Sequence, residues 1–357
     1  MYENDNRTVL TLDAGGTNFV FSAIRGCAHV AAPVRLDAVT DNVERCLDVI
    51  VTGFRKVEAQ LEEKAVAISF AFPGPADYAA GIIGDLPNFP CFRGGVALGP
   101  FLADIFGLPV FINNDGNLFA YGEALSGALP AINKALEEAG SSQRYRNLLG
   151  ITLGTGFGAG VVVDGRLLSG DNGCGGDVWL MRNVLSPTQI VEENVSIRAV
   201  RRVYRELSQD PAELSPKDIF EIAEGSRPGH ADAAREAFRR LGVAAADAMA
   251  HALDITDGLV VIGGGLSGAS AYFLPAMIEA MGPWLQMEVT DLTSRQGMLR
   301  FLEDRSELIS VPGSSRKVRY RKEKKTGVMV SRIGTSTAIA LGAYAYALSR
   351  IDNTYQL

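Results

Sequence analysis

One short pattern occurs twice in the chain and constrains its fold more than any other feature: an apolar run, a glycine-rich turn and a second apolar run. The first copy is LTLDAGGTNFVFSAIRG at residues 10–26, and the second is NLLGITLGTGFGAGVVVDGRLLSG at residues 147–170. Each copy predicts two strands that meet at a tight turn. Two copies indicate a duplicated fold, and a length of 357 residues is typical of two domains or of one large α/β unit.

The patterns between the two copies indicate an α/β class. Residues 42–63 have helical spacing, residues 64–77 read as a buried strand that ends in a Pro-Gly loop, and residues 109–117 read as a strand that ends at Asn113-Asn114-Asp115. This alternation is typical of strands and helices in separate layers. We predict a small α/β domain at residues 1–118, completed by the C-terminal helix 336–357, and a large domain with the nucleotide site at residues 119–335.

Two segments have no assigned role. Residues 130–147 are polar and charged, and we predict an excursion on the surface. Residues 316–325 are strongly basic, and we predict a solvated loop or hairpin, with contact to an anionic partner as the alternative.

Composition excludes some classes of function. The net charge of −7 argues against nucleic-acid binding, which usually needs a basic face. No apolar run approaches the roughly 20 residues of a membrane span, and the N-terminus is polar, so we expect neither membrane insertion nor a signal peptide. The scattered cysteines Cys27, Cys46, Cys91 and Cys174 predict free thiols and a cytoplasmic location.

Three glycine turns end apolar strands: DAGGTN at 13–18, GTGFGAG at 154–160 and IGGGLSG at 262–268. Each could be turn chemistry alone, but three in one chain favour a function. There is no P-loop motif, and a strand follows GTGFGAG where a dinucleotide motif needs a helix. What remains is a hairpin turn whose backbone N–H groups bind phosphate oxygens, with hydroxyls from Thr17 and Thr155 beside them. Asp13 adds a carboxylate suited to Mg²⁺.

The segments DAGGTN, FPGPAD, LPNFP, NNDGNLFAYGE, GTGFGAGVVVDGRLLSGDNG and VVIGGGLS occur in the order found in ROK-family sugar kinases. The chain resembles this family, part of the actin-like, hexokinase-type ATPase superfamily, over nearly its whole length. The resemblance implies two ribonuclease-H-like α/β domains with an interdomain cleft, closure around the substrates, and a homodimer. It also implies an ATP- and Mg²⁺-dependent hexokinase or glucokinase type of phosphotransferase.

The resemblance implies roles for individual residues. The ATP-binding positions are Gly15, Gly16, Thr17, Gly154, Thr155, Gly156, Gly263, Gly264 and Gly265, with Asp13 for Mg²⁺. The sugar-binding positions are Asn88, Asn114, Asp115, Asp177 and Glu192. Asp115 matches the general base, which would accept the proton of the attacking sugar hydroxyl. From the local sequence alone, Asp115 could equally be a helix N-cap.

The chain departs from the family pattern after the second hairpin. The family commonly has GEIGH there and then a cysteine-rich zinc loop, whereas this chain has CGGDVWLMRNVLSPTQIVEENVS. Asp177 stands in place of the Glu and Leu180 in place of the His, and no cysteine follows, so we predict no structural zinc. The alternatives are a surface acid for Asp177 and a plain helix-surface residue for Glu192. For Trp179 we expect a buried core position rather than sugar stacking. Glu123 matches a position of the family pattern, and a helix-surface or structural role is equally open.

The predicted reaction is transfer of the ATP γ-phosphoryl to the 6-hydroxyl of a hexose, with glucose favoured. An N-acetylhexosamine or fructose kinase, and a noncatalytic sugar-binding member, are the alternatives. A sugar-responsive repressor is disfavoured, because the phosphate motif begins about ten residues into the chain and the charge is acidic.

Overall fold

The computed structural model describes residues 2–14, 18–74, 76–84 and 90–354, which fall into two compact units. The first comprises Met1–Gly127, Gly160–Gly176 and Arg332–Leu357, and the second comprises Ala128–Ala159 and Asp177–Ser331. Both combine strands and helices, which confirms the predicted α/β class. The domain boundaries inferred from the sequence remain a proposal.

The first unit is built on a six-stranded sheet. Its strands are β1 (Val9–Ala14), β2 (Asn18–Arg25), β3 (Ala28–His29), β4 (Val34–Asp37), β5 (Ala67–Ala71) and β8 (Val110–Asn113). The order is β3-β2-β1-β5-β8, with β4 paired to β2. β1 and β2 are antiparallel, as the first copy of the repeated pattern predicts, whereas β1, β5 and β8 are parallel. The carboxyl ends of these three strands therefore lie at one edge of the sheet.

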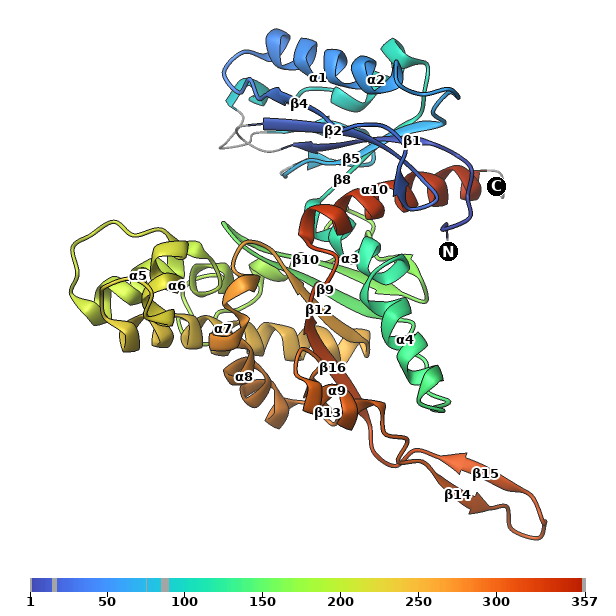
Figure 1. Ribbon diagram of the computed structural model, residues 1–357, viewed down its shortest axis with the longest axis vertical. Coiled ribbons are helices and arrows are strands. Elements are labelled where there is room, and N and C mark those ends of the chain that lie inside the picture. The colour runs from blue at the N-terminus through green and yellow to red at the C-terminus, as the bar shows by residue number, and fades with distance from the viewer. Residues whose placement is uncertain (1, 15–17, 75, 85–89, 355–357) are drawn as a thin grey trace. The chain divides into compact units, whose positions relative to one another are not determined.

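Helices cover both faces of this sheet. The helices of the unit are α1 (Val43–Glu58), α2 (Leu98–Phe106), α3 (Asp115–Leu125) and α10 (Thr335–Thr354), of which α3 packs mainly against α10. Figure 1 shows α1 and α2 on one face and α10 on the other. In α1 the buried side chains of Cys46, Ile50, Phe54 and Val57 follow helical spacing, and Asn42 caps the first turn by accepting from Arg45 N. Two short strands, β6 (Ala76–Asp77) and β7 (Ile82–Ile83), and the strand β11 (Arg166–Leu167) complete the unit.

Small residues let α3 and α10 approach closely. A Cβ on Gly122 would lie 1.9 Å from the carbonyl oxygen of Ala338, and one on Gly342 would lie 1.9 Å from that of Leu118. No side chain fits at either distance, so glycine is required at both positions. This contact fixes the helix that follows β8 against the C-terminal helix.

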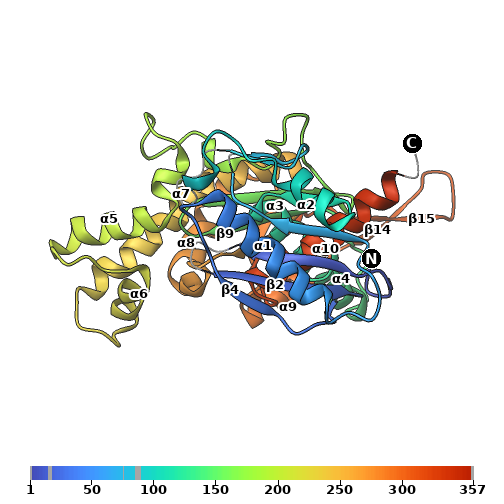
Figure 2. The same ribbon diagram turned by 90° about the horizontal axis from the view of Figure 1, so that it is seen from above.

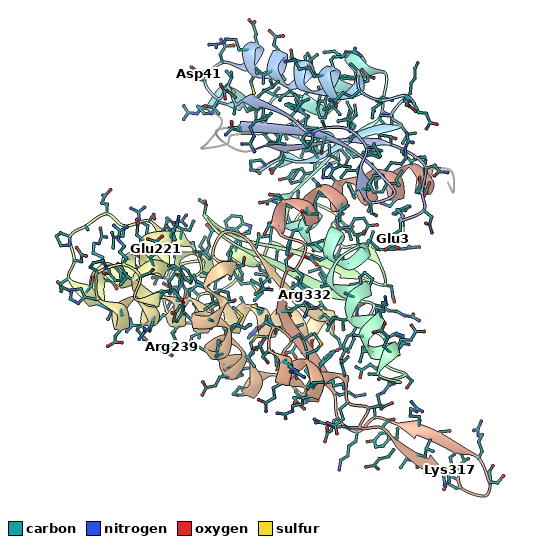
Figure 3. The ribbon with its side chains drawn as sticks, viewed as in Figure 1. Glu3, Asp41, Glu221, Arg239, Lys317 and Arg332 are labelled. Carbon is teal, nitrogen blue, oxygen red and sulfur yellow. The ribbon has the colours of Figure 1, made fainter. Side chains whose placement is uncertain are left out.

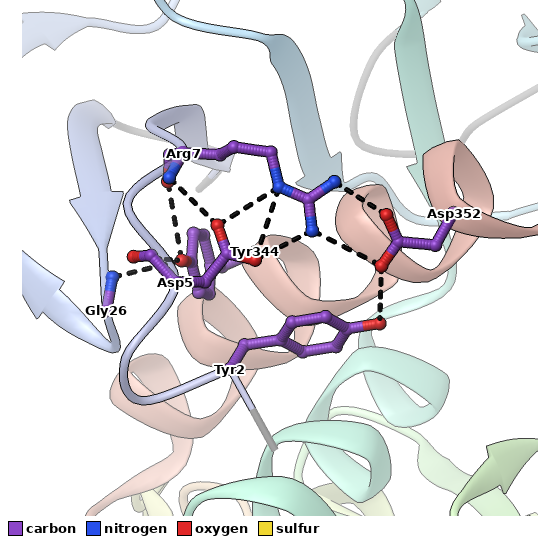
Figure 4. A network of polar contacts seen from close by, with 6 residues as sticks. All are labelled: Tyr2, Asp5, Arg7, Gly26, Tyr344 and Asp352. Atoms are coloured by element: carbon purple, nitrogen blue, oxygen red, sulfur yellow. Dashed lines mark hydrogen bonds and ion pairs between the residues drawn. The ribbon is translucent and has the colours of Figure 1, made fainter.

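A polar network ties the start of the chain to α10 (Figure 4). The Arg7 guanidinium contacts Asp352 Oδ1 at 2.6 Å and Asp5 Oδ2 at 2.7 Å. The hydrogen bond from Arg7 holds the pKa of the Asp5 carboxyl below its ordinary value. The Tyr344 hydroxyl accepts from Gly26 N at 2.9 Å, which links the turn after β2 to the same helix.

The other large sheet, ordered β11-β10-β9-β12-β16-β13, lies mainly in the second unit, although β11 and the end of β10 from Gly160 onward are grouped with the first. Its strands are β9 (Leu148–Leu153), β10 (Phe157–Val163), β12 (Leu259–Gly263), β13 (Glu288–Asp291) and β16 (Lys325–Val330). β9, β12 and β16 are parallel, so their carboxyl ends also share an edge. The helices of the second unit are α4 (Ala128–Glu138), α5 (Ile197–Ser208), α6 (Pro216–Glu224), α7 (Ala231–Thr256), α8 (Ser270–Met281) and α9 (Arg295–Leu302). Helix α7 packs against α5 and α8.

The segment at residues 130–147 lies largely on the surface, as predicted, but it is a packed helix followed by an anchored loop and not a simple polar excursion. Much of the segment belongs to α4, which buries Ile132 and Leu136. Tyr145 is also buried, and its hydroxyl donates to the carbonyl oxygen of Lys325 at 2.6 Å. The (i, i+4) spacing of the two apolar residues was a helical signal among many charged neighbours.

The basic segment at residues 316–325 does form a hairpin strand, but it ends earlier than the composition suggests. Lys325 is already the first residue of β16, a strand of the large sheet. Its ammonium group donates to the carbonyl oxygen of Glu303 at 2.7 Å. The following Thr326 is fully buried, so the strongly basic composition hides the start of a core strand.

All four cysteines are free thiols, as predicted. Within the described ranges, no group of three or more His, Cys, Asp or Glu side chains is arranged to hold a metal ion. The predicted absence of zinc remains a prediction. Of the helices in the described part of the chain, none is both long and apolar enough to cross a bilayer.

Candidate active site

Two carboxylates lie at the carboxyl edge of the first sheet. Asp13 of β1 is aligned with Ala71 of β5, which is aligned in turn with Asn113 of β8. Asp115 lies two residues after the end of β8, so it is at the same edge of the sheet as Asp13. Both side chains are solvent-accessible. The parallel arrangement thus gathers two acids that are a hundred residues apart in the sequence.

Asn114, and not Asp115, caps α3. The Asn114 Oδ1 accepts from Gly116 N at 2.8 Å, and Asp115 is already the first helical residue. The buried Asn113 stabilises this turn. Its Oδ1 accepts from Asn114 N at 2.8 Å and from Asn117 Nδ2 at 3.1 Å. The N-cap alternative for Asp115 is therefore wrong.

The surroundings of Asp115 raise the pKa of its carboxyl group. Asp115 stays accessible at the edge of the sheet, but the protein packed around it displaces part of its hydration, which is the largest cause, and the negative charge of Asp13 acts in the same direction. A hydrogen bond from Gly116 N, at 2.9 Å to Oδ1, acts in the opposite direction. A carboxylate with a raised pKa is a stronger base toward a hydroxyl proton than an ordinary aspartate.

In the second unit, the turn Gly154–Gly156 joins β9 to β10 and rests on the start of α5. Ile197 N donates to the carbonyl oxygen of Gly154 at 2.8 Å, and the Arg198 guanidinium donates to that of Thr155 at 3.3 Å. Thr155 itself is exposed. The carbonyl groups of the turn are therefore bound to the start of α5, while the side chain of Thr155 remains accessible.

Glu192 braces the same turn. Its Oε2 accepts from Phe157 N at 3.0 Å, and its Oε1 accepts from Arg198 at 3.2 Å. Arg198 also pairs with Glu193 at 2.9 Å. Glu192 is thus bound to the turn after β9 and is not a plain helix-surface residue; its predicted contact with sugar remains a proposal.

The third glycine turn lies beside the second. Gly263 of β12 is aligned with Thr152 of β9, and Leu266 N donates to the carbonyl oxygen of Leu153 at 2.9 Å. Gly264 has φ +88°, and a Cβ there would lie 2.3 Å from that same oxygen. Only glycine fits such a conformation at such an approach. By contrast, open space surrounds the Cβ positions of Gly154 and Gly265.

The remaining predicted residues fall in three groups. Gly15, Gly16, Thr17 and Asn88 lie outside the described residues. Asp177 is exposed immediately before the 3₁₀ turn Val178–Leu180. Trp179 is 36% exposed, so the expected core position is wrong, and Glu123 is fully buried, which excludes the surface alternative.

No pattern in the sequence indicates the hydrogen-bond network that organises the loop before Glu192. The buried Asn183 Oδ1 accepts from Leu185 N, Ser186 N and Asn194 Nδ2, each at 3.1 Å. Its Nδ2 donates to the carbonyl oxygen of Ile190 at 3.1 Å. The Asn183 side chain thus supplies hydrogen-bond partners for backbone groups across a loop with little regular structure. This loop leads to Glu192.

The model of the ROK family matches residues 9–296. The chain belongs to the ROK family. It is 30% identical to a glucokinase from Thermotoga maritima over 294 residues, which cover 73% of this chain and 83% of that protein. The crystal structure of a glucokinase from Parabacteroides distasonis is 60% identical, with a TM-score of 0.91 and coverage of 98% of this chain and 99% of that one.

Similarity also extends to enzymes for another sugar. An N-acetyl-D-glucosamine kinase from Vibrio cholerae is 31% identical over 173 residues, 48% of this chain and 51% of that protein. The chain thus aligns with about half the length of that relative. Together the relatives support the predicted enzyme class, a hexokinase- or glucokinase-type phosphotransferase.

Proposed function

We propose that this chain is an ATP- and Mg²⁺-dependent hexose kinase that transfers the γ-phosphoryl of ATP to the 6-hydroxyl of glucose. The observation that carries the proposal is the position of Asp115. Asp115 follows a strand at the carboxyl edge of parallel strands, and the helix after it is capped by Asn114 and not by Asp115 itself. The pKa of the Asp115 carboxyl group is also raised.

In the proposed reaction, Asp115 accepts the proton of the sugar 6-hydroxyl while the oxygen attacks the γ-phosphorus and ADP leaves. A sugar hydroxyl is a poor nucleophile at neutral pH, and a positioned base contributes about 10²–10⁴ in rate. Asn114 uses Oδ1 for the cap, so its Nδ2 is the group that we propose donates to the sugar. Asp177, Glu192 and Asn88 are the other proposed sugar contacts.

The second unit fits a phosphate chain. The turn Gly154–Gly156 has an exposed threonine, and open space lies beside Gly154 and Gly265 where any side chain would protrude. Backbone N–H groups at such turns act as fixed partial positive charges toward phosphate oxygens. We propose that this turn binds the phosphates and that Gly263–Gly265 lies at the adenosine. The first phosphate turn, Gly15–Thr17, is proposed from the sequence alone.

Asp13 fits a magnesium ion because it offers an exposed carboxylate at a strand end, and Mg²⁺ prefers oxygen ligands with retained water. When bound, Mg²⁺ would neutralise charge on the transferred phosphoryl group. The charge of Asp13 also acts on Asp115 directly, since it raises the pKa of that carboxyl.

Glucose is proposed on the strength of the glucokinase relatives, and an N-acetylhexosamine is the second candidate because of the partial match to N-acetylglucosamine kinases. The test is ADP release with glucose, mannose, N-acetylglucosamine, N-acetylmannosamine and fructose. The proposal predicts the highest kcat/KM for glucose. A higher kcat/KM for N-acetylglucosamine would make that sugar, and not glucose, the proposed substrate. No ADP release with any of the five sugars would reject the kinase activity.

We also propose a cytoplasmic location, which the free thiols support, and no nucleic-acid or membrane partner.

A further inference from the structure

A hairpin that we call the arm, residues 303–324, extends from the second unit between α9 and β16. Its strands β14 (Glu307–Ser310) and β15 (Lys317–Tyr320) form a separate two-stranded sheet. Figures 1 and 2 show both strands projecting beyond α9 and β13 of the same unit. Every residue of both strands is exposed. An isolated two-stranded hairpin is marginally stable in water, so a persistent arm needs a covering surface.

Ion pairs anchor the base of the arm. Arg305 contacts Glu288 of β13 at 3.2 Å and Glu323 at 3.0 Å. Arg319 contacts Asp304 at 3.1 Å. The first of these joins the arm to the edge strand of the large sheet, and the others join its two sides. These contacts tie the base of the arm to the second unit.

One face of the arm carries three of its apolar side chains. Ile309 and Val318 are directly opposite each other, and Tyr320 lies two residues along on the same side, opposite Glu307. These side chains are 44%, 44% and 49% exposed. The other face carries Leu308 opposite Arg319, followed by Ser310 opposite Lys317, which Figure 3 labels near the end of the arm. Such alternation is typical of a sheet with one face packed against protein.

The arm and the rest of the chain have opposite charge. The arm has seven Lys and Arg against four Asp and Glu, whereas the rest of the chain has 27 against 37. A partner for this surface must offer apolar contact and negative charge together. The body of a second copy of this chain has the required charge, whereas nucleic acid would leave the apolar face without a partner.

We propose that the arm packs its apolar face, Ile309, Val318 and Tyr320, against the body of a second copy, whose own arm does the same in return. Reciprocal arms make a closed two-fold dimer, which removes two exposed apolar strand pairs that would otherwise promote aggregation. The basic flanks then face an acidic surface. This inference is independent of the proposed reaction, because no proposed site residue lies in the arm.

The test is the mass of the full chain in solution, by light scattering on a size-exclusion column over a dilution series. We expect about twice the 38.1 kDa of one chain. Val318→Asp should raise the dissociation constant at least tenfold. Leu308→Asp is the matched control, since it places the same charge in the same hairpin on the opposite, more exposed face, and it should leave the mass unchanged. Replacement of residues 306–322 by a short Gly-Ser turn should give a monomer with native circular dichroism.

A photo-crosslinker at Tyr320 identifies what the arm contacts. The proposal predicts crosslinks to a second copy, at peptides outside residues 303–324. A monomer at all concentrations would overturn the proposal, as would a dimer that survives both Val318→Asp and removal of the arm. Crosslinks confined to the other arm, or a monomer whose arm binds duplex DNA, would also overturn it.

Discussion

Removing the carboxylate of Glu192 should loosen the phosphate turn and weaken ATP binding more than sugar binding. The Glu192 Oε2 accepts from Phe157 N at 3.0 Å, and its side chain is only 20% exposed. In Glu192→Ala this N–H loses its charged acceptor, and Arg198 loses one of its two acidic partners. The turn then keeps the contacts from α5 but loses its brace on the β10 side.

The size of the effect follows from the bonds removed. A hydrogen bond to a charged group contributes about 1.5–3 kcal/mol, so if the whole loss falls on ATP binding, KM for ATP should rise about 10- to 150-fold in Glu192→Ala. Glu192→Gln keeps one oxygen for Phe157 N and loses mainly the half-exposed ion pair, worth at most about 1 kcal/mol, so a rise of about fivefold or less is expected. The assay is coupled ADP release, with ATP varied at saturating glucose and then glucose varied at saturating ATP.

Glu193→Gln is the matched control. Glu193 also pairs with Arg198, but it is Glu192 that accepts the hydrogen bond from Phe157 N of the turn. The control should therefore leave both KM values within about twofold of the wild type, as expected for one exposed ion pair. A rise in the KM for glucose with an unchanged KM for ATP would refute the brace and favour Glu192 as a direct sugar ligand. No change in either would refute both roles.

Four further predictions concern the same site. Because the pKa of Asp115 is raised and the base must be ionised, kcat/KM should fall with decreasing pH through a pKa above the ordinary aspartate value of about 3.9; an acid limb at or below that value contradicts the assignment. Asn183→Ala should lower the free energy of unfolding in urea by about 2–4 kcal/mol, since four hydrogen bonds are lost; a change under about 0.5 kcal/mol would mean that the network contributes little. Gly264→Ala should impair folding or ATP binding because its Cβ meets backbone, whereas Gly265→Ala, with open space, should be tolerated; equal behaviour would count against the close approach. Asp13→Ala should raise the Mg²⁺ concentration needed for half-maximal activity, and an unchanged titration would remove Asp13 from the metal site.

The elements that were predictable from the sequence have strong local patterns. The repeated strand-turn-strand segments and α1 are examples, because their burial follows the periodicity of a strand or a helix. The position of Asp115 was predictable for the same reason, since it follows a clear strand and precedes a helix. Which of Asn114 and Asp115 caps that helix was not, because both residue types are good caps and only the geometry decides.

The contacts that were not predictable join residues far apart in the chain. Glu192 meets Phe157 across 35 residues, and no periodicity reports such a pairing. The Asn183 network lies in a loop with no repeating pattern, so its buried amide looks like any polar loop residue. β16 begins inside a strongly basic segment, where composition masks the four buried positions that follow Lys325.

The most direct test of the central claim is ³¹P NMR of a reaction of the purified chain with ATP, Mg²⁺ and glucose, run in parallel with Asp115→Asn. The amide is close in size to the carboxylate but cannot accept the hydroxyl proton. The account predicts glucose 6-phosphate and ADP in equal amounts from the wild type, and a rate at least a hundredfold lower from the variant, with both substrates still bound. A variant that keeps more than about a tenth of the wild-type rate would contradict Asp115 as the base. A wild type that forms no phosphate ester from glucose or from any of the four other sugars would contradict the kinase itself.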